Sequence, residues 1–210
     1  MSMPLLTHSG QQVNLALPQP GMIRLADIAL ALSRIPRFGG HTLRPWSVAD
    51  HSLLVCDLMG APAPDLALAA LLHDAHEAYL GDLVLPVQIA LRGIGHQAND
   101  AWRLLSADLD KAIARAVALD PEMFDHPAIQ QADALALAIE ARRLMPPMPD
   151  KFWPAADLPD PLPDLPARDA MGAQNAVLLR AFRLLGDRHG TRLDIAVAPA
   201  ADGGGSDAVG

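Results

Sequence analysis

The residues in this chain that best suit chemistry are the adjacent His73 and Asp74, which lie within the apolar run LALAALLHDAHEAY. A buried charge is costly unless it is paired or bound to a metal, so an imidazole beside a carboxylate in such a run needs a compensating partner. His51 upstream, in SVADHSLLV, and Asp133 downstream, in IQQADALALAIE, repeat the anomaly. One divalent cation would compensate all four residues, and the set therefore predicts a single metal site.

This combination of two imidazoles and two carboxylates is typical of hydrolytic metal sites, which keep coordination positions open for water and substrate. On an octahedral ion, four protein ligands leave two positions, enough for a nucleophilic water and one phosphoryl oxygen. The ligand types do not distinguish among Mn, Co, Fe, Ni, Zn and Mg. A purely structural zinc site is disfavoured, because such sites usually contain thiolates.

Two further carboxylates are candidates for proton transfer beside that metal. Glu77 lies four residues after His73 and three after Asp74, on the same face of a continuous helix. A carboxylate there could orient or deprotonate water, or protonate a leaving oxygen. Asp82, which follows Gly81, could supply a second such group from a loop. The residues do not indicate which carboxylate takes which role.

Each of these residues also has a purely structural interpretation. A lone histidine such as His51 on an apolar helix is more often a hydrogen-bonded core residue than a ligand. Asp133 alone could be a polar helix residue bonded to a loop, and Glu77 a solvated surface charge. Asp82 after a glycine is equally suited to a turn or a cap. The metal hypothesis rests on the set and not on any one member.

Three other potentially reactive residues are interpreted as structural. We expect His41 and His76 to be surface or supporting groups rather than ligands. Cys56 lies in an apolar helical stretch, which favours a small buried hydrophobe over a nucleophile. A single cysteine excludes an internal disulfide framework and fits a reducing compartment.

The composition predicts an all-α fold that could position these residues. Apolar residues make up 51% of the chain and aromatic residues only 4%, and Ala and Leu dominate, which favours packed helices over sheets. Neighbouring side chains on a helix point about 100° apart. His73 and Asp74 can therefore share one ion only if it lies in a crevice between their helix and others. We expect a helical bundle with the metal site at its centre.

Periodicity and capping signals predict the elements of this bundle. Ser47 is expected to cap a helix that ends near Met59, with Asp50 three residues on as an imperfect capping box. Asp65 is expected to cap the next helix, which runs to Gly81 and is followed by the loop GDLVLPV. The remaining helices are expected from about 24 to 36, over 97–119, at 121 as a short helix, over 126–145, and over about 168–188.

The segments outside the helices divide the chain further. Residues 1–21 are predicted to form an N-terminal arm with a short hairpin, and 22–190 a single domain. Eight of the 22 residues in 145–166 are proline, so 146–166 is interpreted as a stiff strap over the surface. Residues 191–210 are expected to be a disordered tail.

Charge and hydropathy exclude several classes of partner. A net charge of −8 argues against binding of nucleic-acid polymers, although one metal ion and a few arginines can still attract a phosphorylated small molecule. No signal peptide and no uninterrupted apolar run of membrane-spanning length is evident. A cytoplasmic protein without a membrane partner is therefore expected.

These motifs resemble the HD-domain metal-dependent phosphohydrolase superfamily, whose pattern is H…HD…D. More narrowly, the chain is similar to the bacterial 5′-deoxynucleotidases and related small HD hydrolases of bacteria and phages. The matching stretches stand in the family's order and cover roughly residues 22–145: RFGGH, SVADHSLLV, LLHDAHEAYLGDLVLPV and QQADALALAIE. A bare HD dipeptide carries little information, whereas the extended HDAHEAYLGD run with VADHS and QQAD is highly specific.

The resemblance assigns roles to individual residues. The four predicted metal ligands match those of the family, Glu77 matches its catalytic acidic residue, and Asp82 matches the carboxylate of its GD loop. Arg37 matches an arginine that contacts phosphate or sugar, and Phe38 an aromatic residue that often packs near the nucleoside. Relatives commonly have a lysine where this chain has Gln88. Loss of that cation should weaken contacts to additional phosphates, unless Arg92 replaces it from one turn further along. It is therefore open whether the substrate is a mono- or a triphosphate.

The resemblance implies an enzyme with one divalent metal that removes phosphate from a nucleotide, most closely a deoxyribonucleoside 5′-monophosphate. Two alternatives stay open: a hydrolase of nucleoside triphosphates or signalling nucleotides, and a non-catalytic nucleotide-binding regulatory HD module. The presence of both Glu77 and Asp82 argues against the second. Relatives are often homodimers, and the Ala- and Leu-rich faces leave apolar surface available, so a homodimer is expected.

Overall fold

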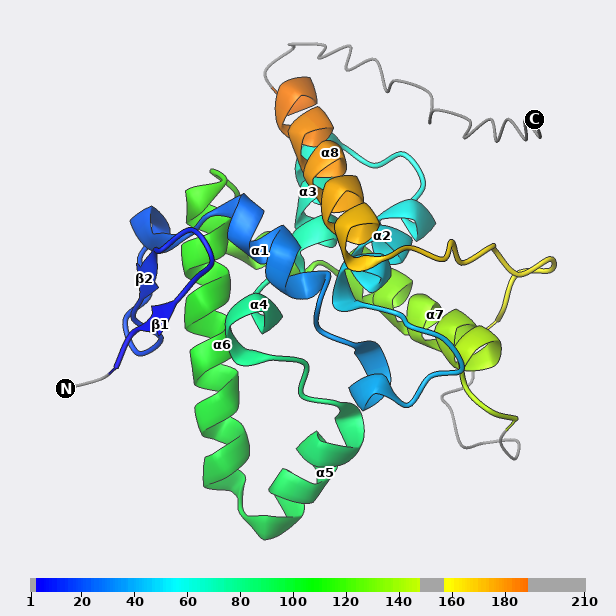
Figure 1. Cartoon of the computed structure of the whole chain (residues 1–210), viewed down its shortest axis with the longest axis horizontal. Helices are drawn as coiled ribbons and strands as arrows, with labels where there is room; N and C mark the ends of the chain where they lie inside the picture. Colours follow the sequence, from blue (N-terminus) through cyan, green and yellow to red (C-terminus); the bar gives the residue numbers. More distant parts are fainter. Residues whose placement is uncertain (1–2, 148–156, 189–210) are drawn as a thin grey trace, which may run out of the picture.

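The computed structural model describes residues 3–147 and 157–188, which are mostly helical (Figure 1). The longer helices are α1 (Leu25–Leu32), α2 (Val48–Leu58), α3 (Pro64–Leu72), α5 (Leu85–Ile94), α6 (His96–Ala116), α7 (Pro127–Leu144) and α8 (Ala170–Arg188). The short elements are β1 (Leu5–Leu6), β2 (Gln12–Val13), η1 (Pro20–Met22), η2 (Arg37–Gly40), α4 (Glu77–Leu80) and η3 (Pro121–Asp125). The all-α class is confirmed, and so is the hairpin, because β1 and β2 pair antiparallel.

Helix α2 lies at the centre of the bundle and packs against α3, α7 and α8. All nine residues from Val48 to Cys56 are buried, including the polar His51. A helix that is buried on every side belongs to the interior of a domain. The first turns of α2 therefore place His51 in the core, where neighbouring helices can bring other side chains to it.

The start of α2 is the capping box that the sequence predicts. The Ser47 hydroxyl accepts a hydrogen bond from the Asp50 backbone N–H at 3.1 Å, and the Asp50 carboxylate accepts one from the Ser47 N–H at 3.2 Å. Arg168 also pairs with Asp50 at 3.0 Å. These bonds fix the first turn of α2 and hence the position of His51.

The predicted continuous helix from Asp65 to Gly81 is wrong. Helix α3 has Ala63 at its N-cap and ends at Leu72, and α4 begins only at Glu77. Between them the backbone forms tighter turns, in which the Ala75 N–H donates to Leu72 and the Glu77 N–H to Asp74, each a bond to the third residue back. Such turns have about three residues per turn instead of 3.6, a difference too small for hydrophobic spacing to detect over four residues.

The predicted loop GDLVLPV is also too long, because only Gly81–Val84 is irregular before α5 begins. Pro86 lies in the first turn of α5, where its missing N–H has no helical partner to lose. The Gln88 amide donates to the Leu83 carbonyl at 2.7 Å and so secures that turn. Helix α5 packs against α6 and has no buried residue of its own, so α5 and the N-terminal part of α6 project from the body of the molecule (Figure 1). The C-terminal part of α6 supplies core residues such as Leu109 and Ile113.

The other helices form close to their expected positions, although α1 ends at Leu32, before the expected boundary near Pro36. Residues 148–156 of the predicted strap and the predicted tail at 191–210 lie outside the described residues. The described part of the strap has no helix or strand, and its carbonyls accept hydrogen bonds from Arg143, at Leu162, and from Arg44, at Leu165. None of the helices in 3–147 or 157–188 is long and apolar enough to cross a membrane.

Candidate metal centre

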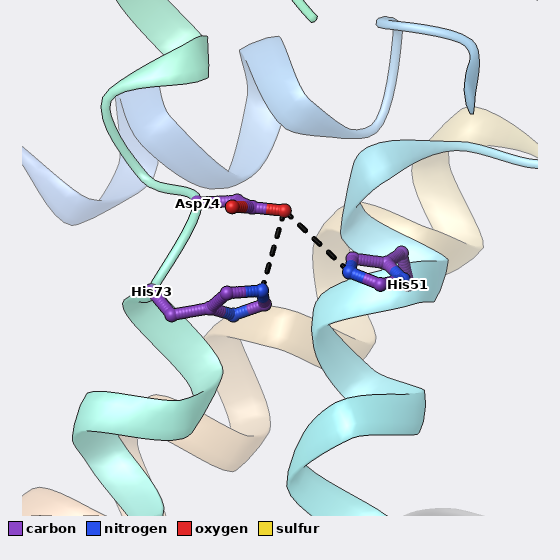
Figure 2. A group of neighbouring side chains, drawn as sticks. All are labelled: His51, His73 and Asp74. Atoms are coloured by element: carbon purple, nitrogen blue, oxygen red, sulfur yellow. Dashed lines mark ion pairs between the residues drawn. The ribbon is translucent and has the colours of Figure 1, made fainter. Parts of the chain in front are cut away.

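His51, His73 and Asp74 meet between α2 and the end of α3 (Figure 2). The Asp74 Oδ2 atom lies 3.5 Å from the His51 Nε2 and 3.3 Å from the His73 Nε2. One ligand atom from each residue lies within 4.8 Å of the others, so the three side chains could hold a metal ion. The break after Leu72 matters here, because Asp74 belongs to the turn and not to a continuous helix.

Asp133, the fourth predicted ligand, reaches the same group from α7. Its Oδ1 atom lies 3.1 Å from the His51 Nε2 and 4.0 Å from the His73 Nε2. The His51 side chain is 0% exposed, whereas that of Asp133 is 46% exposed. The group is therefore closed behind His51 and open to solvent on the side of Asp133.

The two histidines are oriented by their other ring nitrogens. The His73 Nδ1 donates to the Ala70 carbonyl at 2.9 Å, and the His51 Nδ1 lies 2.8 Å from a carboxylate oxygen of Glu140. A proton on Nδ1 leaves the lone pair of the neutral ring on Nε2. Both Nε2 atoms are buried without a hydrogen-bond partner among the described residues. Two such nitrogens facing two carboxylates fit a divalent cation.

Glu140 is a site residue that the sequence analysis missed. Its side chain is fully buried, and its Oε1 atom accepts hydrogen bonds from the Trp46 indole at 2.7 Å and from His51. Its Oε2 atom lies 3.4 Å from the Arg37 guanidinium. Glu140 follows Asp133 by seven residues, two helical turns, so a charged residue on the apolar part of that helix was the available signal.

Glu77 is buried, with an exposed fraction of 8%, so its interpretation as a solvated surface charge is wrong. Its Oε2 atom has no hydrogen-bond partner within the described chain. Burial and the charges of Asp74 and Asp82 raise the pKa of Glu77 to about 9, although Arg37 opposes them. Without a metal, Glu77 is therefore protonated at neutral pH.

Asp82 shares this environment from the loop after α4. Its Oδ2 atom is buried and also lacks a hydrogen-bond partner in the described residues. Burial and the charge of Asp74 raise the pKa of the Asp82 carboxyl, and Arg37 opposes the shift. The structure therefore brings both predicted proton-handling carboxylates into the electrostatic field of Asp74.

Arg37 is the cation of this carboxylate-rich region. Its side chain is 13% exposed. Burial disfavours its charge, but Glu140, Asp74 and Asp82 outweigh burial and raise the pKa of Arg37, so that it stays charged. The guanidinium carbon lies 5.6 Å from the centroid of the Phe38 ring. Phe38 has a φ of 54°, in the left-handed region that non-glycine residues rarely adopt.

The charge balance favours a cation at the two histidines. Burial and Arg37 lower the pKa of His51, but Glu140 and Asp133 outweigh them and raise it to about 10. His73, His51 and Arg37 together hold the pKa of Asp74 well below its usual range, against burial. In the absence of a metal, a proton on His51 supplies the positive charge that these carboxylates require. A metal ion would replace that proton.

The two histidines interpreted as supporting or surface groups have such positions. The His76 Nδ1 atom lies 3.0 Å from a carboxylate oxygen of Asp110, which joins the turn before α4 to α6. His41 is exposed at the end of η2. Cys56 is a free, buried cysteine, as expected.

The chain belongs to a protein family with members in bacteria. It is 36% identical over 148 residues to an uncharacterized protein of Rhodobacter capsulatus, a match that covers 65% of this chain and 70% of that protein. It is 33% identical over 136 residues to the uncharacterized protein YfdR of Escherichia coli strain K12, a match that covers 64% of this chain and 68% of that protein. No family model matches the chain. The names of these relatives state no activity.

Proposed function

We propose that the protein is an HD-domain metal-dependent phosphohydrolase that removes phosphate from nucleotides, with deoxyribonucleoside 5′-monophosphates as its substrates. The observation that carries this proposal is the convergence of the two unpartnered Nε2 atoms of His51 and His73 on the Asp74 carboxylate. Arg37 and Glu77, a cation and a proton-holding carboxyl, lie in the same electrostatic environment.

The proposed metal ligands are His51, His73, Asp74 and Asp133. A divalent cation bound to them supplies a Lewis acid that activates water and stabilises charge on phosphoryl oxygens. Arg37 retains guanidinium donors for a phosphate oxygen, since its Nε has no hydrogen-bond partner in the described chain.

Glu77 and Asp82 share the proposed proton transfers. Each has a buried carboxyl oxygen without a hydrogen-bond partner among the described residues. The pKa of Glu77, raised to about 9, favours a group that holds a proton and can release it to a leaving oxygen. Burial shifts the pKa of Asp82 in the same direction. Two such carboxyls beside one centre can supply one proton donor and one acceptor.

The environment of Gln88 favours a monophosphate substrate. Its amide is engaged with the Leu83 carbonyl, and it offers no cation where the resembling enzymes commonly have lysine. Additional phosphates would therefore lack a positive partner at this position of α5, where Arg92 is the nearest arginine along the helix. A nucleoside triphosphate or signalling nucleotide is the alternative substrate class for the same ligand set.

The experiment that tests this proposal is a screen of deoxy- and ribonucleoside mono- and triphosphates against Mn, Co, Fe, Ni, Zn and Mg, with identification of every product. We expect inorganic phosphate and a deoxynucleoside from deoxyribonucleoside monophosphates. Release of pyrophosphate or triphosphate would instead identify a triphosphate hydrolase. Tight nucleotide binding with no product over hours would identify a regulatory module.

Asp74→Asn is the variant that tests the metal centre itself. The change preserves size but removes the negative charge between the two histidines, so we expect loss of both bound metal and turnover. Asp108→Asn is the matched control, since Asp108 is an exposed carboxylate that pairs with Lys111 on the surface of α6. Metal analysis and phosphate release would be measured together, and undiminished release by metal-free Asp74→Asn protein would contradict the mechanism.

A further inference from the structure

We propose that Glu140 is a positioning residue that orients the metal ligand His51 and the phosphate-binding cation Arg37 through one carboxylate. This inference rests on the proposed function, because it concerns the metal and the phosphate of that site. It assigns no contact with the substrate to Glu140. Its role is to fix the orientation of the His51 ring, which presents Nε2 to the metal, and of the Arg37 guanidinium, which presents its N–H groups to the phosphate.

The surroundings of Glu140 explain why its carboxylate is rigid. The side chain is 0% exposed and stands among the buried residues Ala138, Ile139 and Ala141 of α7. A buried charge persists only when hydrogen bonds and opposite charges compensate it. Here the donors come from Trp46, His51 and Arg37, which lie before and within α2. Glu140 therefore connects α7 to the segment that carries both functional side chains.

The two oxygens of Glu140 serve different partners. Oε1 accepts from the Trp46 indole at 2.7 Å and lies 2.8 Å from the His51 Nδ1. The proton held on Nδ1 leaves Nε2 as the ligand atom, and a carboxylate behind a ligating histidine increases its basicity. Trp46 holds the oxygen in place, so the orientation of the His51 ring depends on a fixed acceptor.

Oε2 of Glu140 lies 3.4 Å from an Nη atom of Arg37 and holds the guanidinium by one edge. The Arg37 Nε atom is buried and has no hydrogen-bond partner in the described chain. A guanidinium has five N–H donors in a rigid fork, so Arg37 can pair with Glu140 and still offer donors to a phosphate. The buried Arg37 Nε–H lacks an acceptor among the described residues, which indicates that a ligand supplies the acceptor.

Glu140→Gln separates these effects because it preserves shape. The amide oxygen of glutamine can still accept from Trp46 and His51, but the amide N–H₂ group then faces Arg37, donor against donor. We expect the Kd for Mn²⁺ alone, measured by calorimetry on metal-free protein, to rise about 10- to 100-fold, as for other partners of ligating histidines. At saturating Mn²⁺, KM for a deoxyribonucleoside monophosphate should also rise, because Arg37 has lost its fixed position.

Asp27→Asn is the matched control, because Asp27 is also a buried carboxylate that accepts several hydrogen bonds, here from Thr7 and Ser9 of the N-terminal hairpin. Its Mn²⁺ Kd should stay within about twofold of wild type. Trp46→Phe is the second variant, used if Glu140→Gln does not fold by circular dichroism. It removes the indole N–H that donates to Oε1, and we expect a smaller increase in the Mn²⁺ Kd.

The outcomes separate this inference from the proposed function. Wild-type protein that binds no divalent metal would overturn both. Tight Mn²⁺ binding by the wild type, with an unchanged Kd and KM in folded Glu140→Gln protein, would overturn the role of Glu140 alone. If only Trp46→Phe folds, an unchanged Mn²⁺ Kd in that variant overturns the role. A rise in Kd confined to the Glu140 and Trp46 variants supports it.

Discussion

Glu77 shows how the surroundings of one residue can shift its pKa. Its carboxyl is buried close to the negative charges of Asp74 and Asp82, and these three effects raise its pKa to about 9. The amino-acid type alone gave no indication of this, because a glutamate on a short helix is usually exposed. The sequence placed Glu77 beside the site by its spacing on a continuous helix, which the structure does not have. Its raised pKa depends on charges that only folding brings together.

We predict that Glu77→Gln lowers kcat about 10²- to 10⁴-fold, the usual contribution of a general acid or base. Metal binding should change little, since Glu77 is not among the proposed ligands. The measurements are kcat at saturating metal and the Mn²⁺ Kd. Glu122→Gln, an exposed glutamate on η3, is the control. A fall in kcat that is fully explained by lost metal would argue against a role in proton transfer.

At the scale of elements, the turn between α3 and α4 is the feature that most affects the site. It carries Asp74, whose carboxylate lies between the two histidines, and leads directly into Glu77. The sequence predicted a continuous helix here, because apolar spacing does not distinguish an α-helix from tighter turns over four residues. Conversely, the capping box at Ser47 was predictable, because it depends on residues three apart in the chain.

The contact between the N-terminal hairpin and α1 gives a prediction on stability and pH. Burial would raise the pKa of Asp27, but hydrogen bonds from Ser9 and Thr7 outweigh burial and hold it below its usual range. The ionised carboxylate therefore stabilises the fold above about pH 4, the ordinary value in an unfolded chain. This contribution is lost as the pH falls through the lower pKa of the folded state.

We expect Asp27→Asn to lower the free energy of unfolding at pH 7 by about 1–3 kcal/mol, the range for hydrogen bonds to a charged group. The loss of stability between about pH 4 and pH 2 should be smaller in the variant than in the wild type. Urea unfolding at a series of pH values measures both quantities. Parallel pH profiles for the two proteins would show that Asp27 has no such role.

At the scale of the whole molecule, the candidate metal centre joins segments that are distant in sequence. Its ligands come from α2, the end of α3, the turn after it, and α7. A ligand that binds only the folded state stabilises it, by about 2.7 kcal/mol at 100 times its Kd. For a domain of this size, that corresponds to an increase in Tm of about 5–10 °C.

We therefore predict that Mn²⁺ at about 100 times its Kd raises Tm by that amount relative to chelator-treated protein. Asp74→Asn protein should show no such increase, because it lacks the central carboxylate. Differential scanning calorimetry with and without metal measures the effect. An equal metal-dependent increase in Asp74→Asn would place the bound metal elsewhere in the molecule.

The sequence by itself determined the helical class, the hairpin, the cap of α2 and four residues that the structure brings together. Those features follow from composition, from local hydrogen bonding and from the cost of leaving charges in apolar helices. Only the tertiary structure decided the break at His73–Asp74, the depth of Glu77 and the place of Glu140. The place of Glu140, for example, depends on its contact with His51, which lies 89 residues away in the chain. The spacing of neighbouring residues in the sequence carries no information about such contacts.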